Sequence, residues 1–430
     1  MSDPGVTALV EHLFRRQAGR IVAALARRLG PASLDVAEDV VQDALVQALR
    51  TWPFRGVPDD PAAWLFRVAR NRALDLVRRD AALRHRRADV EAWAQEGAAA
   101  AQRGPPARGA DDAGDDELAL LYACCHPAVP REAGVALALK TVGGLGVGEI
   151  ARAFLAEEAT VAQRLVRAKR RLREAGVAIP ATAAELAGRT PAVLETLYLL
   201  FNEGYSASGG DALVRRELCA EAVRLARLVA GHAATGTPAA HALAALMLFH
   251  AARLHERTDD VGDPVLLDAQ DRARWDAGLT SLAFRHLERA AAGSELTRYH
   301  LEAEIASHHA LAPSVERTDW RAVLAAYDAL RRLAPSPVIE VHRAVAVGMV
   351  VGPEAALAAL AAVAAAGGGA ARLARYPWFY ATRAHWLARA GRGAEAAADY
   401  RRACDLAPSG PVRRFLAARL RALLSAAAPG

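Results

Sequence analysis

The stretch EEATVAQRLVRAKRRLRE, residues 157–174, combines two patterns in one segment. Between positions 162 and 173 it holds six basic residues and no acidic one. Its apolar residues recur at helical spacing, so one face can pack on other helices while the opposite face stays polar. These apolar residues are Val161, Leu165, Ala168 and Leu172. The stretch predicts a helix over about residues 158–173 with a buried stripe and a basic face.

A shorter helical segment, around residues 149–154, precedes this helix after a brief turn. Two helices joined by a tight turn, the second more basic, form the helix-turn-helix plan. On the polar face Thr160, Gln163 and Arg164 are of types that hydrogen-bond base edges, while cations farther along reach phosphates. Those cations are Arg167, Lys169, Arg170 and Arg171. The alternative is a charged surface helix without a ligand, because such patterns are short.

The composition of the whole chain is that of a globular protein with several domains. The chain has 430 residues, 53% of them hydrophobic and 24% charged, and a formal net charge of +6 that favours an acidic partner. Its four cysteines form no C-x-x-C pair, which indicates neither a disulfide framework nor a zinc finger and fits a reducing cytoplasm. The N-terminal stretch reads as an amphipathic helix without the apolar h-region and cleavage site expected of a signal peptide, and no apolar run reads as a membrane span.

No run of alternating apolar and polar residues is long enough to predict a strand, so the expected fold class is all-α. Residues 1–90 form a first helical block, and a segment rich in Ala, Gly, Pro and Asp, residues 91–116, is predicted to be a flexible linker. A second block covers residues 117–180. A helical extension is predicted over residues 186–318, followed by helical repeats over residues 319–430.

Three helices are predicted in the first block. The first covers about residues 6–29. The second begins near Asp35, which has capping-box spacing to Glu38, and its apolar side is formed by small residues. The other side of this helix is acidic. The third is capped by Asp60, and residues 67–87 hold eight arginines, which suggests phosphate contact or, alternatively, a solvated arginine-rich surface.

Three segments, in order and spacing, resemble regions of extracytoplasmic-function (ECF) sigma factors of the sigma-70 family. DVAEDVVQDALVQALRTW (35–52) and PAAWLFRVARNRALDLVRR (61–79) resemble region 2, and VGEIARAFLAEEATVAQRLVRAKRRLRE (147–174) resembles region 4. The resemblance implies a non-enzymatic protein without cofactor or metal that directs core RNA polymerase to promoter DNA and assists its opening. The linker between the two domains would pass through polymerase, as the corresponding linker does in the family.

The resemblance also assigns residues to three surfaces. In this family the acidic helix of region 2 docks on the β′ clamp helices of polymerase, and region 4 is expected on the β flap. The residues that the resemblance assigns to polymerase binding are Asp35, Glu38, Asp39, Gln42 and Asp43. Capture of the −10 element falls to Phe54, Arg55, Trp64, Arg67, Arg70, Asn71 and Arg78, with a core role as the alternative for Trp64. Recognition of the −35 element falls to Thr160, Gln163, Arg164, Arg167, Lys169, Arg170 and Arg171.

The C-terminal half contains a repeat. AAYDALRRLAPSP (325–337) and ADYRRACDLAPSG (398–410) share a tyrosine followed eight residues later by proline, at an offset of 73 residues. That offset is about two tetratricopeptide (TPR) periods, which predicts a TPR-like array with Gly391 in one of its turns. With RTPAVLETLYLLFNEGYSAS (189–208), the array resembles a subgroup of ECF factors with a long C-terminal extension. That resemblance implies regulation by the extension through a protein or small-molecule partner.

Two other functions stay open. One is a helix-turn-helix regulator with a TPR-like scaffold that does not bind polymerase. The other is an enzyme, which rests on NEGYSAS (202–208) and on His300, Glu304 and His308 at helical spacing. For these three residues, and for Cys124 and Cys125 in CCHP, ordinary packing is the favoured interpretation over a metal site.

Overall fold

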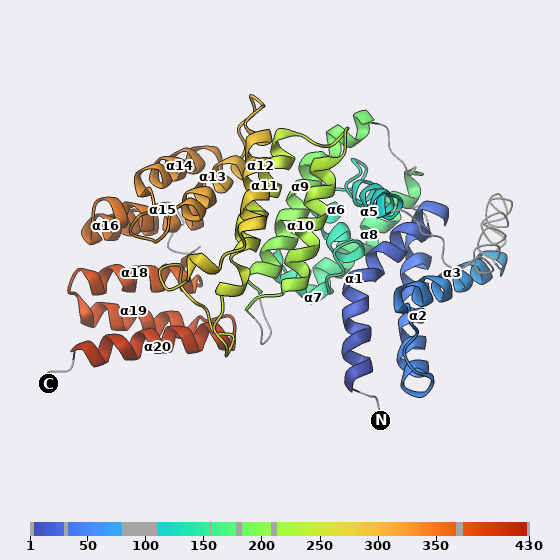
Figure 1. The fold of residues 1–430 in the computed structure, drawn as a ribbon, viewed down its shortest axis with the longest axis horizontal. Coiled ribbons are helices and arrows are strands. Elements are labelled where there is room, and N and C mark those ends of the chain that lie inside the picture. Colours follow the sequence, from blue (N-terminus) through green and yellow to red (C-terminus); the bar gives the residue numbers. More distant parts are fainter. Residues whose placement is uncertain are drawn as a thin grey trace. The chain divides into compact units, whose positions relative to one another are not determined.

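The computed structural model describes residues 4–29, 33–79, 110–154, 156–177, 183–207, 213–366 and 373–427. These residues form helices joined by turns and loops, with an isolated bridge between Thr258 and Pro264 and no strand within the described ranges (Figure 1). The prediction of an all-α fold is confirmed. The chain divides into two compact units, Met1–Leu200 with Gly231–Thr235, and Phe201–Ala230 with Gly236–Gly430.

Unit 1 is built around the first helix of the chain. Its helices are α1 (Pro4–Leu29), α2 (Leu34–Arg55), α3 (Pro61–Arg79), α5 (Ala110–Cys124), α6 (Arg131–Thr141), α7 (Val147–Ala153), α8 (Glu158–Glu174) and the first part of α9 (Ala183–Tyr205). α1 packs against α2 and α3 on one side and against α5 and α6 on another. Leu25 and Ala26 of α1 are completely buried in this packing. The packing of their apolar faces stabilises these helices, because most helical stability in proteins comes from tertiary packing and not from helix propensity.

Polar contacts reinforce the packing of α1 on α5. Arg27 of α1 pairs with Asp116, and Arg20 Nε lies 3.5 Å from the carboxylate of Glu117. Both carboxylates are buried. Gly19 allows the close approach of α1 to α6, because a Cβ there would lie 2.6 Å from the carbonyl oxygen of Val142. The two N-terminal blocks, predicted as separate domains, therefore form one unit.

The predicted flexible linker is shorter than expected at its C-terminal end. α5 begins at Ala110, so the last part of the predicted segment 91–116 is helical. Residues 91–109 lie outside the described residues.

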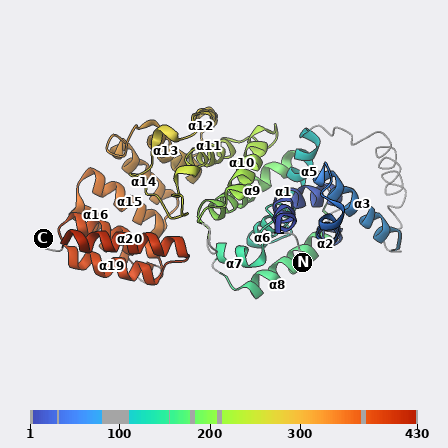
Figure 2. The ribbon, with the colours of Figure 1, turned by 60° about the horizontal axis from the view of Figure 1, so that its bottom comes forward.

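Unit 2 is a succession of helices in which sequence neighbours pack side by side. They are α10 (Arg216–Gly231), α11 (Pro238–Ala252), η3 (Leu254–Glu256), η4 (Arg272–Arg274), α12 (Ala277–Ala290), α13 (Arg298–Leu311), α14 (Trp320–Leu333), α15 (Pro337–Val350), α16 (Pro353–Ala365), α18 (Pro377–Arg389), α19 (Gly393–Asp405) and α20 (Gly410–Ala427). α18, α19 and α20 lie alongside one another (Figure 1), and Figure 2 shows α19 and α20 side by side from another direction. The helical array is observed over the predicted repeats, while its TPR identity stays a prediction.

The turn between α18 and α19 follows the sequence expectation. Gly391 has φ of 78°, a left-handed conformation that glycine adopts at little cost. The core beneath this pair contains Trp386, which is 1% exposed and lies against Gly348 of α15. A Cβ at Gly348 would lie 2.3 Å from the Trp386 ring, so this pair sets how closely α15 and α18 approach.

Candidate functional site

α2 has the two faces that its sequence predicts. Its apolar side is buried, as expected, and includes Ala37, Val41, Ala44 and Ala48. Its N-terminus differs from the prediction, because the helix begins at Leu34 and no side-chain cap hydrogen bond forms. The predicted capping box of Asp35 and Glu38 is therefore wrong. Both carboxylates bind cations of another helix instead.

The acidic face of α2 is divided into two parts. Asp39, Gln42 and Asp43 are exposed. Asp43 lies 3.4 Å from Arg72 Nε in an ion pair whose partners are both more than half exposed, so that pair contributes little stability. Asp35 and Glu38, at the N-terminal end of the helix, face α8.

Lys169 of α8 joins the two helices. Its Nζ donates to Glu38 Oε2 at 2.6 Å and lies 2.9 Å from Asp35 Oδ1, while Arg173 Nη2 donates to Asp35 Oδ2 at 2.6 Å. Burial acts to lower the pKa of Lys169, but the hydrogen bonds and charges of Glu38 and Asp35 outweigh it and raise that pKa. We call these four residues the α2–α8 clasp. In this structure α2 already provides the anionic partners of Lys169, and its contact with phosphates stays a prediction.

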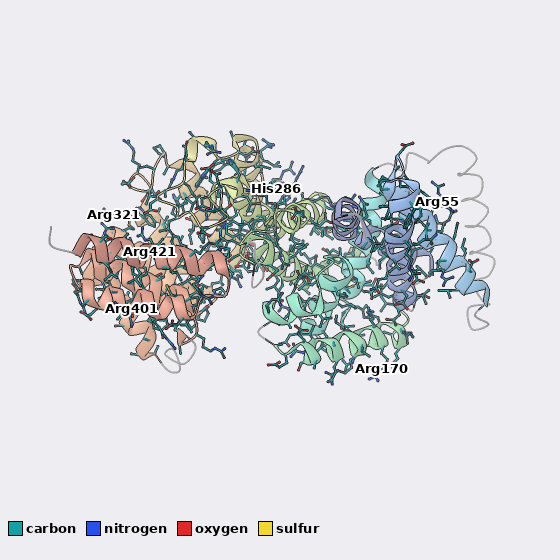
Figure 3. The ribbon with its side chains drawn as sticks, turned by 90° about the horizontal axis from the view of Figure 1, so that it is seen from below. Arg55, Arg170, His286, Arg321, Arg401 and Arg421 are labelled. Atoms are coloured by element: carbon teal, nitrogen blue, oxygen red, sulfur yellow. The ribbon has the colours of Figure 1, made fainter. Side chains whose placement is uncertain are left out.

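α8 otherwise matches its predicted pattern. Val161, Leu165, Ala168 and Leu172 are buried. On the polar side the exposed candidates are Thr160, Gln163, Arg167, Arg170 and Arg171, of which Arg170 is labelled in Figure 3. Arg164, like Lys169, is half-buried, and its Nη1 lies 3.2 Å from Glu132 of α6.

The helix before it, α7, begins after Gly146, whose backbone N–H donates to Glu149 Oε2 at 2.6 Å. α7 and α8 pack on each other and α8 packs on α6. This arrangement keeps most of the basic face of α8 exposed. The predicted side chains therefore lie together on one helix, with Arg164 and Lys169 held by acidic partners.

The candidate −10 surface spans the end of α2 and the start of α3. Phe54 is 86% exposed, and Arg55, labelled in Figure 3, is also exposed. An exposed phenylalanine with so little packing is a candidate for stacking on a base. The Asp60 cap of α3 is confirmed by a 2.9 Å bond from the Ala63 N–H to Asp60 Oδ1.

On α3 the cationic candidates cluster. Arg67 and Asn71 are exposed, and half-buried Arg70 donates to Asn71 Oδ1 at 3.3 Å. Burial and then the charge of Arg67 lower the pKa of Arg70, which an added phosphate would offset. The side chain of Arg78 lies outside the described residues.

Trp64 has a structural contact. Its ring meets that of Trp52 edge to face at a centroid distance of 5.4 Å, and Trp52 is only 2% exposed. The contact supports the core role kept as the alternative for Trp64.

The weaker metal candidates do not assemble into a site in the described part of the chain. No group of three or more His, Cys, Asp or Glu side chains there could hold a metal ion. His300 Nδ1 accepts from the Thr297 backbone N–H at 3.1 Å. Cys124 and Cys125 are buried free thiols, and burial raises the pKa of Cys125 to about 12, so packing explains both.

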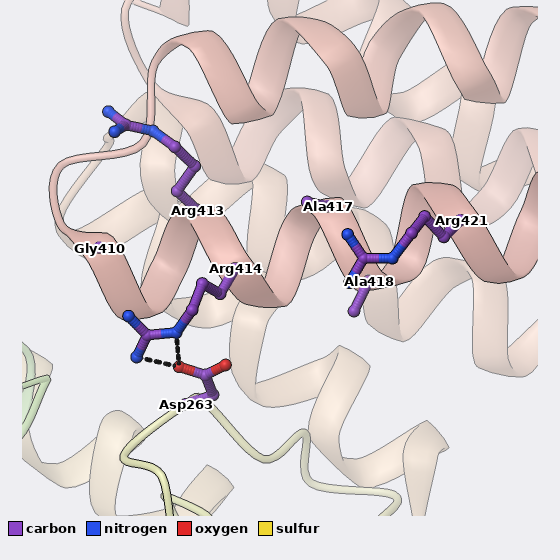
Figure 4. Close-up of a pocket in the computed structure, with 7 residues that line it drawn as sticks. All are labelled: Asp263, Gly410, Arg413, Arg414, Ala417, Ala418 and Arg421. Atoms are coloured by element: carbon purple, nitrogen blue, oxygen red, sulfur yellow. Dashed lines mark hydrogen bonds and ion pairs between the residues drawn. The ribbon is translucent and has the colours of Figure 1, made fainter.

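Unit 2 has a surface hollow of about 460 Å³ along α20 (Figure 4). Three arginines line it, and one of them, Arg414, is neutralised by Asp263, whose Oδ1 lies 2.9 Å from Arg414 Nε. Its lining residues are Asp263, Gly410, Arg413, Arg414, Ala417, Ala418 and Arg421. Sequence reasoning missed this hollow, and it also missed a cluster around Tyr205, although NEGYSAS drew attention to that segment.

None of the described helices has the length and apolar character needed to cross a lipid bilayer.

Comparison with known proteins finds two family models that match separate parts of the chain. Residues 14–83 match the family model of sigma-70 region 2, and residues 189–291 match a family of unknown function (DUF6596). The uncharacterized protein R00370 of Rhizobium meliloti (strain 1021) is 39% identical over 394 residues, which cover 90% of either chain. No solved structure matches.

Proposed function

We propose that this chain, which belongs to one family with its Rhizobium meliloti relative and carries a sigma-70 region 2 domain, is a sigma factor of the ECF type. The region 2 domain supports the general assignment, an RNA polymerase sigma factor whose partners are core RNA polymerase and promoter DNA. The ECF type, the individual contacts and the role of the extension are the proposal.

The observation that carries the proposal is the opposite character of two exposed surfaces within the matched region 14–83. Asp39, Gln42 and Asp43 present an acidic face on α2, in a chain whose net charge is positive. Phe54 and Arg55 follow at the end of the same helix, exposed and suited to an unpaired base and its backbone. A protein that only held DNA would gain nothing from the acidic face, whereas a basic surface of polymerase would bind it.

The second DNA surface in the proposal is α8. Its buried stripe fixes the helix on α6 and α7, and its exposed Gln163 and Arg167 are of types that contact base edges and phosphates in a major groove. Arg164 would add a base contact only after leaving Glu132.

The α2–α8 clasp connects the two proposed surfaces. Lys169 and Arg173 neutralise Asp35 and Glu38, so the part of the α2 face nearest α8 is already occupied by the chain itself. We infer that polymerase first meets the exposed Asp39, Gln42 and Asp43, and that opening of the clasp then frees the rest of the acidic face together with Lys169. Unit 2 would regulate this step.

Charge reversal tests the polymerase surface. Asp39→Arg in the full chain should abolish co-elution with core polymerase and promoter-specific transcription, while duplex DNA binding through α8 stays at the wild-type level. Glu288→Arg is the matched control, because Glu288 is exposed on α12 in unit 2. Retention of core polymerase by Asp39→Arg at wild-type affinity would overturn the assignment. A wild-type chain that binds DNA but no polymerase would instead support the helix-turn-helix regulator.

A further inference from the structure

A cluster of arginines and aromatic rings surrounds Tyr205 at the end of α9 in unit 2. The guanidinium carbon of Arg257 lies 3.6 Å from the centroid of the Tyr205 ring. Arg253 donates to the Tyr205 hydroxyl, and its guanidinium carbon lies 5.8 Å from the Trp275 ring centroid. Arg272 approaches the same Trp275 ring at 5.3 Å. Three cations thus gather on two rings.

These arginines have neutral hydrogen-bond acceptors. Arg253 Nη1 donates to Gln270 Oε1 at 3.2 Å, and Arg272 Nη1 donates to the carbonyl oxygens of His309 at 2.7 Å and Ala312 at 2.8 Å. Within the described ranges, no carboxylate forms an ion pair with Arg253, Arg257 or Arg272. The exposed Glu316 acts on Arg272 only through its charge at longer range.

Such an arrangement is electrostatically incomplete. Arg253, Arg257 and Arg272 are all half-buried, and withdrawing a cation from water without a counter-charge costs free energy. Burial, followed by the charges of Arg253 and Arg272, lowers the pKa of His309 to about 3. Burial and the same kind of positive field lower the pKa of His250 well below its usual value. The cluster therefore has an excess of positive charge that its own residues do not neutralise.

The cluster also has nitrogens without hydrogen-bond partners. Arg257 Nε, Trp275 Nε1 and His309 Nδ1 are buried and have no hydrogen-bond partner among the residues that the structure describes. Buried polar atoms in folded proteins nearly always have one, and Arg257 Nε and Trp275 Nε1 can only donate, so these two nitrogens beside one cationic cluster indicate a missing acceptor. An anion seated among the arginines would supply both the acceptor oxygens and the negative charge.

We propose that the Tyr205 cluster is a binding site for a small dianionic oxyanion, namely a phosphate group, free or carried as a monoester. The planar fork of a guanidinium matches the oxygens of phosphate, and a dianion would neutralise two of the three cations. The His250 ring lies beside this cluster, with its centroid 4.9 Å from that of Tyr205. Tyr205, Arg253, Arg257, Arg272 and Trp275 all lie in the segment that matches the family of unknown function.

The site can be tested on the full chain by calorimetric titration with sodium phosphate, with sodium chloride at equal ionic strength as the reference. Saturable binding of about one phosphate per chain is expected, and Arg257→Met should weaken it at least tenfold. Arg321→Met is the matched control, because Arg321 is exposed on α14 (Figure 3) and should bind phosphate as the wild type does. A simple phosphate monoester in a parallel titration separates the two sources, since tighter binding than free phosphate identifies an organic ligand.

A second readout keeps the test decisive if Arg257→Met fails to fold. The charges of Arg253 and Arg257 together lower the pKa of Tyr205 although burial acts to raise it. Bound phosphate should therefore raise that pKa, measured as the difference in phenolate absorbance between the wild type and Tyr205→Phe. Equal effects of phosphate and chloride, or undiminished phosphate binding in a folded Arg257→Met variant, would overturn the proposal.

Discussion

Lys169 in α8 and the arginines around Tyr205 are all cations partly withdrawn from water, but the two regions differ in the charge of the groups that bind them. Lys169 has two carboxylates from α2 within 2.9 Å. Among the described residues, the oxygens within hydrogen-bond distance of Arg253 and Arg272 are all neutral. A compensated cation joins parts of a protein, whereas an uncompensated cluster is complete only with an anion from outside. The source of the counter-charge therefore separates an internal clasp from a proposed ligand site.

Reversing one charge in the clasp should have the largest effect. Glu38→Lys replaces the partner of Lys169 by a second cation and should weaken the α2–α8 contact by about 3 kcal/mol. Hydrogen exchange at α8 amides should then accelerate by about 100-fold, because each 1.4 kcal/mol is a factor of ten. Asp39→Lys is the matched control on the exposed part of the same face, where we expect a change within about 0.5 kcal/mol. Unchanged exchange in Glu38→Lys would mean that the clasp does not hold the helices.

The second largest effect is expected from acid, which should lower the free energy of unfolding through His309 beside the Tyr205 cluster. The pKa of His309 is lowered to about 3 in the folded chain, so below about pH 6.5 the unfolded chain binds a proton that the folded one does not. The free energy of unfolding should fall as pH decreases, by up to about 2 kcal/mol at pH 5. Urea denaturation followed by circular dichroism at pH 7 and pH 5 measures this loss. The His309→Gln variant should lose less free energy of unfolding between pH 7 and pH 5. An identical loss in that variant would contradict the assignment of this pH dependence to His309.

Removing an uncompensated cation should have the opposite sign from breaking an ion pair. Arg257→Met is expected to raise the free energy of unfolding by about 1 kcal/mol in chloride buffer, because it removes a charge that no described carboxylate compensates. Arg383→Met is the comparison in the same unit, since Arg383 Nε and Nη2 each lie 2.6 Å from an oxygen of Asp399. The free energy of unfolding of Arg383→Met should fall by about 1 kcal/mol or more. Urea denaturation midpoints in chloride buffer measure the stability of both variants. A lower midpoint for Arg257→Met as well as for Arg383→Met would contradict the difference between a compensated and an uncompensated cation.

Helix positions and faces follow from local spacing, which explains how much of this protein its sequence predicts. The α8 stripe, the buried side of α2 and the Asp60 cap depend on residues a few positions apart, and all were predicted correctly. The capping box of Asp35 and Glu38 failed although its spacing was suitable. The reason is a longer-range partner, because Lys169 lies 131 residues from Glu38 in the sequence.

The amino-acid sequence by itself determined the all-α fold, the sigma-70 resemblance and the division into acidic and basic helix faces, because each depends on periodicity or on contiguous motifs. Only the tertiary structure decided which charges meet. It placed α8 beside α2 and gathered Tyr205, Arg253, Arg272 and His309 from separate helices and loops. Electrostatic compensation depends on distances in space, and those distances arise only when the apolar faces of the helices pack.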